Sequence, residues 1–240
     1  MMWEHLKQEQ KEKYKTLITN FASLSEAFSQ KAEGEDSDDR ESYVAPIVNS
    51  KFQETVFQKA FHAVGEDIAN TSYDASLVVD EQHRYLVGIK SFGLDSGDQK
   101  IAQFKKDSQS WNELLSEIRF HAEISPDKET ADKENRARYE KLAREIASLR
   151  NQRIESSKAL IKGFHSDSSH VEAVYHVLMP TSKGHKPQIH VGETSYLPVD
   201  LDHLKILGST TKNNPTNFRF TDGQHDYKYT AADSQLHMTF

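Results

Sequence analysis

Asp74 and Lys90 stand at the outer ends of two short apolar runs, residues 75–79 and 85–89. The runs are rich in Val, Leu and Tyr and are separated by five polar residues, a pattern typical of a β-hairpin. Folding brings the two outer ends together, because the second strand runs back alongside the first. A connection of five residues is expected to place Asp74 directly opposite Lys90, on the same face of the sheet.

A carboxylate beside a lysine has the chemistry needed to hydrolyse a phosphodiester bond. Mg²⁺ binds to one or two carboxylates, to water and to substrate phosphate, so Asp74 is a candidate metal ligand. Lys90 can orient the attacking water or stabilise the charge that develops on the phosphate. An ordinary solvated hairpin with a charge at each end shows the same pattern, and both interpretations stay open.

These residues resemble the PD-(D/E)XK nuclease superfamily, the fold of many type II restriction endonucleases. In that family an Asp opens the second core strand and an acidic-X-Lys triplet closes the third, which correspond here to Asp74 and to Gly88-Ile89-Lys90. Tyr73 stands where Pro is usual, and Gly88 stands where the family has its second carboxylate. The resemblance implies Mg²⁺-dependent cleavage of DNA, with Asp74 as a metal ligand and Lys90 as a catalytic residue.

The segment before the hairpin supplies a further candidate. Residues 50–70 have a broad apolar face at helical spacing, so we expect a helix there. Glu54 lies on this helix, and the resemblance implies that it points toward the metal site. A Glu in the first turn of a helix also complements the helix dipole, which is the alternative.

The segment after the hairpin offers a replacement for the missing carboxylate. Residues 99–124 are predicted to form another helix, which carries Gln103 thirteen residues after Lys90. Some family members supply a ligand from this helix, so the resemblance implies that Gln103 is a catalytic residue and a ligand of Mg²⁺. Asp95 and Asp98 are rival ligands, and Gln103 is otherwise an ordinary exposed residue of a helix.

The composition limits the classes of protein to which the chain can belong. Its 240 residues suffice for one large domain or two small ones. The absence of cysteine excludes disulfides, zinc-thiolate sites and thiol catalysis. We find no apolar run of membrane-spanning length and no signal peptide, so we expect a cytoplasmic protein without a membrane partner. The net charge of -7 argues against a general nucleic-acid coat protein, although Lys and Arg can still gather on one face.

Charge and periodicity define the remaining helical segments. Residues 4–29 are predicted to form an amphipathic helix for packing or dimerisation, and the acidic run 33–41 is predicted to be a linker. Ser125-Pro126-Asp127 predicts the start of a helix that ends near residue 162. Its sides carry ten Lys or Arg against seven acids, which suits contacts with DNA phosphates but also a solvated helix with internal ion pairs. The basic residues proposed for these contacts are Arg136, Arg144, Arg150, Arg153 and Lys158.

From residue 170 the chain changes to short strands and turns. The predicted strands are residues 171–179, 188–191, 217–221 and 225–229. The last two are joined through Asp222 and Gly223 and form a hairpin. The loop 209–217 and residues 183–186 are predicted to read DNA bases, although Asn and Thr are also ordinary turn residues. The residues predicted to contact DNA here are Lys183, Lys186, Lys212, Asn213, Asn214, Asn217 and Arg219.

We therefore predict an α/β protein with a restriction-endonuclease-like mixed sheet flanked by helices and a β-rich C-terminal part. The expected parts are an N-terminal helix with its acidic linker (1–45), a nuclease core with the long charged helix (46–165), and a β-rich part that completes the DNA cleft (166–240), or one single domain overall. The resemblance implies a type II restriction endonuclease that cleaves double-stranded DNA with Mg²⁺, and symmetric sites suggest a homodimer. The competing interpretation, favoured by Gly88, is a non-catalytic module that binds DNA or a protein partner.

Overall fold

The computed structural model describes residues 1–29, 50–66, 71–161, 170–181 and 188–240. Its helices are α1 (Met2–His5), α2 (Gln8–Ser29), α3 (Ser50–Phe61), η2 (Ser108–Trp111, a 3-10 helix), α4 (Asn112–Ile124) and α5 (Lys128–Leu160). Its strands are β1 (Val64–Gly65), β2 (Ala75–Val78), β3 (Arg84–Ser91), β4 (Asp98–Gln103), β5 (Val171–Pro180), β6 (Ile189–Ser195), β7 (Lys205–Thr211), β8 (Asn214–Thr221), β9 (Asp226–Thr230) and β10 (Gln235–Thr239). The predicted α/β class is confirmed, and the acidic run 33–41 lies outside the described residues.

The chain divides into two compact units that are interleaved in sequence. Unit 1 consists of Met1–Ser96 and Ile154–Leu197, and unit 2 consists of Gly97–Arg153 and Pro198–Phe240. The expected boundaries near residues 45 and 165 are not the ones that divide the structure. The reason is that each sheet is built from strands far apart in the chain, so neither unit is one continuous segment.

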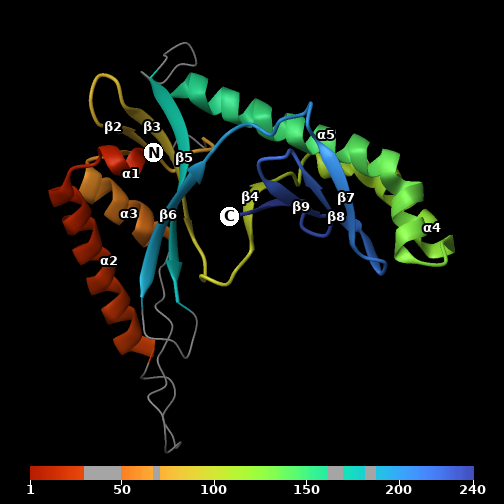
Figure 1. Ribbon diagram of the computed structural model, residues 1–240, viewed down its shortest axis with the longest axis horizontal. Helices are drawn as coiled ribbons and strands as arrows, with labels where there is room; N and C mark the ends of the chain where they lie inside the picture. Colours follow the sequence, from red (N-terminus) through yellow and green to blue (C-terminus); the bar gives the residue numbers. More distant parts are fainter. Residues whose placement is uncertain (30–49, 67–70, 162–169, 182–187) are drawn as a thin grey trace, which may run out of the picture. The chain divides into compact units, whose positions relative to one another are not determined.

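Unit 1 is built on a mixed sheet with the strand order β1-β2-β3-β5-β6, in which β3 and β5 are parallel. The short helix α1 and the helices α2 and α3 belong to this unit and lie to one side of its strands in Figure 1. The residues of β2 and β3 in the core beside these helices are Ala75, Leu77, Tyr85, Val87 and Ile89. Because side chains alternate along a strand, the even-numbered residues of the hairpin face the other side of the sheet.

The N-terminal helix predicted for residues 4–29 is interrupted between α1 and α2. Tyr14 and Ile18 of α2 are buried, as the predicted apolar stripe requires. The Tyr14 hydroxyl lies 2.9 Å from Nε2 of the fully buried His176 on β5. Burial raises the pKa of Tyr14 far above its usual value, so this hydroxyl stays protonated.

Two predicted helices were wrong in part. The helix expected over residues 50–70 ends at Phe61, because His62 adopts a left-handed backbone conformation with φ of 58°, and β1 follows. The helix expected over residues 99–124 begins only at Asn112, and Asp98–Gln103 forms strand β4 instead. Strand β4 pairs with β10 at the C-terminus, and this long-range pairing outweighs the local helical pattern.

Unit 2 is built on an antiparallel sheet with the strand order β4-β10-β9-β8-β7. Tyr139 of α5 stacks on Phe218 of β8 with ring centroids 4.9 Å apart, and its hydroxyl donates to the Pro215 carbonyl at 2.8 Å. The predicted β8–β9 hairpin is confirmed, with Gly223 at φ of 86° in its turn. The predicted loop 209–217 is instead a tight β7–β8 hairpin, because Thr211 pairs with Asn214.

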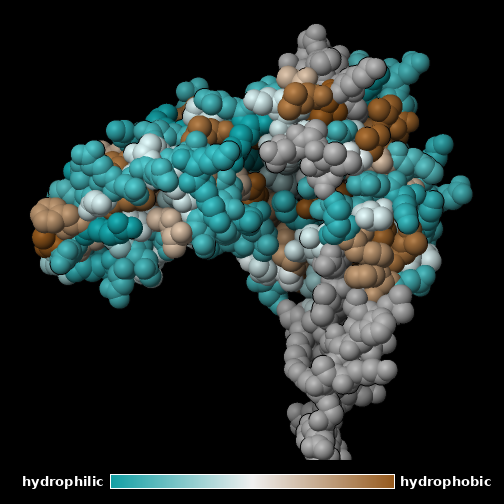
Figure 2. Space-filling view, turned by 180° about the vertical axis from the view of Figure 1, so that it is seen from behind, coloured by the Kyte–Doolittle hydropathy of each residue, from teal (hydrophilic) through white to brown (hydrophobic). Residues whose placement is uncertain are grey.

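The surface drawn in Figure 2 is mainly hydrophilic, with apolar side chains in separate groups. Among the large apolar side chains of α4, Phe120 and Ile124 are well exposed. Within the described residues, no helix combines the length and the apolar character needed to cross a membrane.

Candidate active site

The β2–β3 hairpin sets the positions of Asp74 and Lys90. Ala75 pairs with Val87, and the Asp74 N–H donates to the Val87 carbonyl at 2.9 Å, so Asp74 lies opposite Gly88. The predicted pairing of Asp74 with Lys90 is therefore wrong by two residues. The turn begins one residue earlier than expected, since the Asp80 carboxylate accepts hydrogen bonds from the backbone N–H groups of Gln82 and His83.

Asp74 and Lys90 nevertheless occupy the same face of the sheet. The shift of register is an even number of residues, and side chains repeat every second residue along a strand. Lys90 is thus a diagonal neighbour of Asp74, at roughly 7–8 Å between such positions.

The carboxylate of Asp74 is fixed by the backbone of β3. Its Oδ2 atom accepts a hydrogen bond of 2.6 Å from the Ile89 N–H, and the side chain is half-buried. Among the described residues, none donates a hydrogen bond to Oδ1 of Asp74 in the structure. One oxygen is therefore held in place while the other is available to a ligand.

Lys90 is held through its backbone. The Nε2 group of Gln53, a fully buried residue of α3, donates to the Lys90 carbonyl at 2.9 Å. In the described part of the chain, no carboxylate lies within ion-pair distance of the half-buried Lys90 side chain. Its ammonium group can therefore interact with a substrate phosphate.

Gly88 occupies the position at which the PD-(D/E)XK pattern has its second carboxylate. A Cβ atom on Gly88 would lie 2.8 Å from Cε1 of Tyr196 and 2.9 Å from Cδ1 of Tyr175. These two rings stack with centroids 3.9 Å apart and 12° between their planes. Any side chain at residue 88 must displace this tyrosine pair, so the second carboxylate has no room here.

Glu66 is a second carboxylate on the same face, and the sequence analysis missed it. Its N–H donates to the Asp74 carbonyl at 3.1 Å, which continues the β1–β2 ladder and places Glu66 directly opposite Asp74. Its Oε1 atom accepts a hydrogen bond from the Ser76 hydroxyl. Strand β1 has only 2 residues, too few to produce a recognisable alternation in the sequence.

Glu54, the acid predicted to reach the site from α3, forms an ion pair with Lys51 at 3.0 Å on its own helix. The residue of α3 that contacts the hairpin end is its neighbour Gln53. Glu54 lies beyond the first turn of α3, so its observed role is the ion pair with Lys51 and not the predicted complement to the helix dipole.

The three rival ligands after Lys90 have different surroundings. Gln103 belongs to unit 2, at the end of β4 rather than on a helix, and its side-chain amide donates to the Asp233 carbonyl at 3.0 Å. Asp98 binds Arg219 and Lys228 in the same unit. Asp95 is an exposed loop residue of unit 1. Asp98 and Gln103 thus belong to unit 2, whereas Asp95 belongs to unit 1 with Asp74.

The residues predicted for base recognition around residue 212 have structural roles as well. The Lys212 ammonium donates to the carbonyls of Ser125 and Pro126 after the end of α4. The Asn217 side-chain oxygen accepts the Ala231 N–H at 2.9 Å. Asn213 and Asn214 are exposed at the β7–β8 turn and stay candidates for contact with DNA.

The basic residues predicted for DNA contact are mostly engaged within the protein. Arg150 is only 3% exposed, so its side chain is too buried to contact a DNA phosphate in this conformation. The prediction for Arg150 is therefore wrong. Arg153 donates to the Gln103 carbonyl at 2.6 Å, and Arg219 pairs with Asp98. Lys183 and Lys186 lie outside the described residues.

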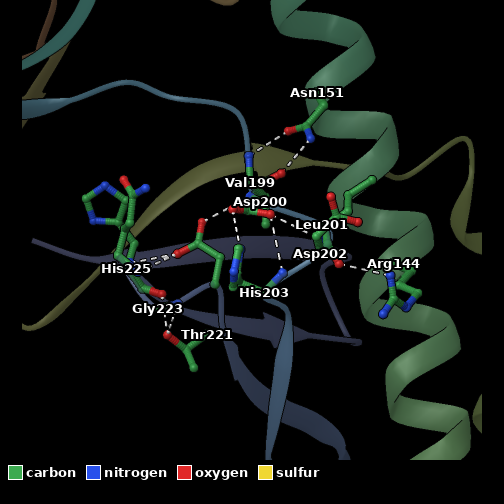
Figure 3. Close-up of polar contacts among 12 residues, drawn as sticks. Arg144, Asn151, Val199, Asp200, Leu201, Asp202, His203, Thr221, Gly223 and His225 are labelled. Atoms are coloured by element: carbon green, nitrogen blue, oxygen red, sulfur yellow. Dashed lines mark hydrogen bonds and ion pairs between the residues drawn. The ribbon is translucent and has the colours of Figure 1, made fainter.

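A dense polar cluster surrounds Asp200 in unit 2 (Figure 3). The Asp200 carboxylate accepts the backbone N–H groups of Asp202 and His203, and the hydrogen bond from the His203 ring lowers its pKa. The side chain of Asn151 on α5 donates to the Val199 carbonyl and accepts the Val199 N–H, each at 2.8 Å. The contacts of Asp200 and Asn151 order the segment before β7, and those among Thr221, Gly223 and His225 order the β8–β9 turn, so we assign the cluster a structural role.

Comparisons with models of protein families, with curated proteins and with solved structures find no match to this chain. Among the described residues, no group of three or more His, Asp or Glu side chains is arranged to hold a metal ion. The site is defined by its own geometry: a fixed Asp, a Lys and a second carboxylate on one face of a mixed sheet.

Proposed function

We propose that the protein is a Mg²⁺-dependent endonuclease that cleaves double-stranded DNA at the β2–β3 end of unit 1. The observation that carries this proposal is that Asp74 and Lys90 lie at one end and on one face of adjacent strands. Asp74 directly precedes β2, the second strand of its sheet in chain order, and Lys90 lies near the end of the third. This is the order of residues in the PD-(D/E)XK family.

The side chains on this face fit a Mg²⁺ ion. The ion accepts one or two carboxylates and completes its coordination with water and substrate phosphate. Asp74 offers its Oδ1 atom, and Glu66 offers a carboxylate from the neighbouring strand. When bound, Mg²⁺ supplies Lewis-acid stabilisation to the phosphodiester that is cleaved.

The protein's own residues orient the reacting groups. The Ile89 N–H keeps the Asp74 carboxylate in one rotamer, and Gln53 restrains the backbone of Lys90. The Lys90 ammonium orients the attacking water or stabilises the additional negative charge on the phosphate in the transition state. Because these groups are positioned before substrate binds, little reorganisation is needed during the reaction.

We further propose sequence-specific cleavage by a homodimer of a cytoplasmic restriction endonuclease. A twofold dimer matches the symmetry of palindromic DNA sites, which is the usual reason for this arrangement. We propose that Asn213 and Asn214, whose amides are exposed at the β7–β8 turn, read base edges.

The test is incubation of the purified protein with plasmid and genomic DNAs, in Mg²⁺ or in chelator. Discrete fragments that require Mg²⁺ are expected. A smear would support a nonspecific nuclease instead, and intact DNA under all conditions would contradict the proposal. Asp74→Asn serves as the inactive control, because it keeps the shape of the side chain while removing its charge.

One observation favours a second candidate, a non-catalytic module that binds DNA or a protein partner. The Tyr175–Tyr196 stack closes the space above Gly88. A DNA-binding module would bind a duplex with the same affinity in the wild type and in the Asp74→Asn variant, whereas a module for a protein partner would not bind it. In neither case would the duplex be cleaved. The cleavage assay above therefore separates the two candidates.

A further inference from the structure

The outer face of the unit 2 sheet carries four basic side chains in one row. His237 of β10 pairs with Lys100 of β4 on one side and with Lys228 of β9 on the other. Lys228 pairs in turn with Arg219 of β8. Adjacent strands lie about 4.8 Å apart, so this basic row crosses four strands and spans roughly 14 Å.

The basic row lies on the side of the sheet opposite the aromatic core. The alternate residues Phe218, Phe220, Tyr227 and Tyr229 are fully buried on the other face. Lys100 is exposed, and the side chains of Arg219 and Lys228 keep 38% and 24% of their surface accessible. These three cations can therefore meet a ligand that lies across the strands.

Like charges on directly opposite residues of a sheet destabilise it, so the basic row needs compensation. Asp98 provides it, since its carboxylate accepts bidentate hydrogen bonds from Arg219 and a bond of 2.7 Å from Lys228. Burial and the nearby charge of Lys228 lower the pKa of His237, so its ring is neutral at pH 7. Arg219 and Lys228 are thus held in fixed positions instead of moving away from each other.

We propose that this face binds the phosphate backbone of double-stranded DNA, an inference that rests on the DNA substrate proposed above. Four cations, Lys100, Lys205, Arg219 and Lys228, share the face with two carboxylates, Asp98 and Asp226. The whole chain has a net charge of -7, so this excess of positive charge is local. A row of about 14 Å corresponds to roughly four base-pair steps along the DNA axis, because the axial rise is about 3.4 Å per phosphate of one strand.

The chemistry of the face indicates phosphate contact rather than base recognition or apolar docking. Lys and Arg side chains on phosphates supply affinity and position a protein on the duplex without reading sequence. The hydroxyls of Thr221, Thr230 and Thr239 at the neighbouring outward positions already donate within the sheet, to the carbonyls of His225 and Gln235 and to the Asp98 carboxylate. Contact with phosphate on the outer face therefore depends on its Lys and Arg side chains.

The test is the affinity of the full-length protein for a labelled DNA duplex, measured by fluorescence anisotropy in chelator at several salt concentrations. The double variant, Lys100→Gln with Lys228→Gln, should bind the duplex about tenfold or more weakly at low salt. It should also reduce the slope of log K against log salt by about 2. Lys100→Gln alone leaves the Asp98 network intact and should reduce the slope by about 1. Circular dichroism and thermal unfolding establish that both variants are folded.

The matched control is Lys133→Gln with Lys141→Gln, the same change of charge at two exposed positions of α5. Unchanged affinity and slope in the Lys100→Gln, Lys228→Gln variant, or an equal loss in the α5 control, would overturn the inference. Binding of polyglutamate in place of the duplex would overturn it too.

The two proposals fail in different ways. If the duplex binds through the basic row but is not cut in Mg²⁺, the proposed nuclease function fails and this inference stands. If the duplex is cut while the row variants bind it normally, the inference fails and the nuclease function stands.

Discussion

The Asp74 carboxylate accepts a hydrogen bond of 2.6 Å from the backbone N–H of Ile89. This bond joins the start of β2 to the end of β3 and fixes the carboxylate beside the residue that precedes Lys90. The bond orients one oxygen of Asp74 toward the backbone and leaves Oδ1 for a cation or a polarised water. The same bond also stabilises the end of the hairpin.

Removing either member of this pair should abolish most of the cleavage. Asp74→Ala and Lys90→Ala are each expected to lower the single-turnover rate by about 10²–10³-fold or more, with DNA binding retained. The double variant should be little worse than either single variant, because residues that act as one unit fail together.

Asp80→Asn is the matched control, since Asp80 belongs to the turn and lies about 20 Å along the strand from Asp74. Its cleavage rate should equal that of the wild type. Normal cleavage by Asp74→Ala would place the catalytic centre elsewhere.

The second carboxylate of the site can be identified from the Mg²⁺ requirement. Glu66→Gln should raise the Mg²⁺ concentration for half-maximal cleavage by about an order of magnitude, because a neutral amide binds the ion more weakly than a carboxylate. Gln103→Ala should leave this concentration unchanged, since the Gln103 amide already binds the Asp233 carbonyl. The opposite result, a shift for Gln103→Ala and none for Glu66→Gln, would return the ligand to Gln103.

A side chain at residue 88 should destabilise unit 1. Gly88→Ala places a Cβ atom within 2.9 Å of two tyrosine rings and is expected to cost about 1–3 kcal/mol in the free energy of unfolding. Gly88→Glu should cost more and should not increase cleavage, because the Tyr175–Tyr196 stack blocks the position. Gly93→Ala is the control, as no atom lies within 4 Å of the added Cβ. A stable and more active Gly88→Glu protein would contradict this prediction, because it would show that the Tyr175 and Tyr196 rings can move aside at little cost.

The Asp98 cluster makes a pH-dependent contribution to stability. Burial raises the pKa of Asp98, but hydrogen bonds from Lys228, Arg219 and Thr239 outweigh it and lower the pKa to about 2. Because the pKa is lower in the folded protein, this contribution is complete above the unfolded value of about 4 and is lost as the pH falls toward 2. Its size is about 2 kcal/mol.

The measurement for Asp98 is denaturant unfolding of the wild type and of Asp98→Asn between pH 7 and pH 3. The variant should be less stable at pH 7, and the difference should shrink as the pH falls below 4. A constant difference would show that the carboxylate charge does not contribute.

Tyr14 secures a buried histidine in unit 1. Tyr14→Phe removes the hydroxyl that lies 2.9 Å from Nε2 of His176, and an unpaired buried nitrogen costs about 1–3 kcal/mol. Thr16→Ala on the exposed side of α2 should change stability by less than about 0.5 kcal/mol. Equal unfolding free energies for Tyr14→Phe and the wild type would mean that water replaces the hydroxyl.

The sequence by itself determined the features that depend on neighbouring residues. The β2–β3 and β8–β9 hairpins and the long helix α5 were predicted correctly, because alternation, turn residues and helical periodicity are local signals. The sequence also determined that Asp74 and Lys90 share a face, since an odd number of residues in the loop conserves the alternation.

Only the tertiary structure decided which distant residues complete these elements. Strand β1 brings Glu66 beside Asp74. Tyr175 of β5 and Tyr196, which directly follows β6, lie more than eighty residues after Gly88 in the chain. Asp98–Gln103 forms a strand because it pairs with the edge of β10. The same pairing places Lys100 beside His237 in the basic row. Backbone hydrogen bonds and side-chain packing between remote segments select one arrangement among several that local preference allows, and no short stretch of sequence contains that information.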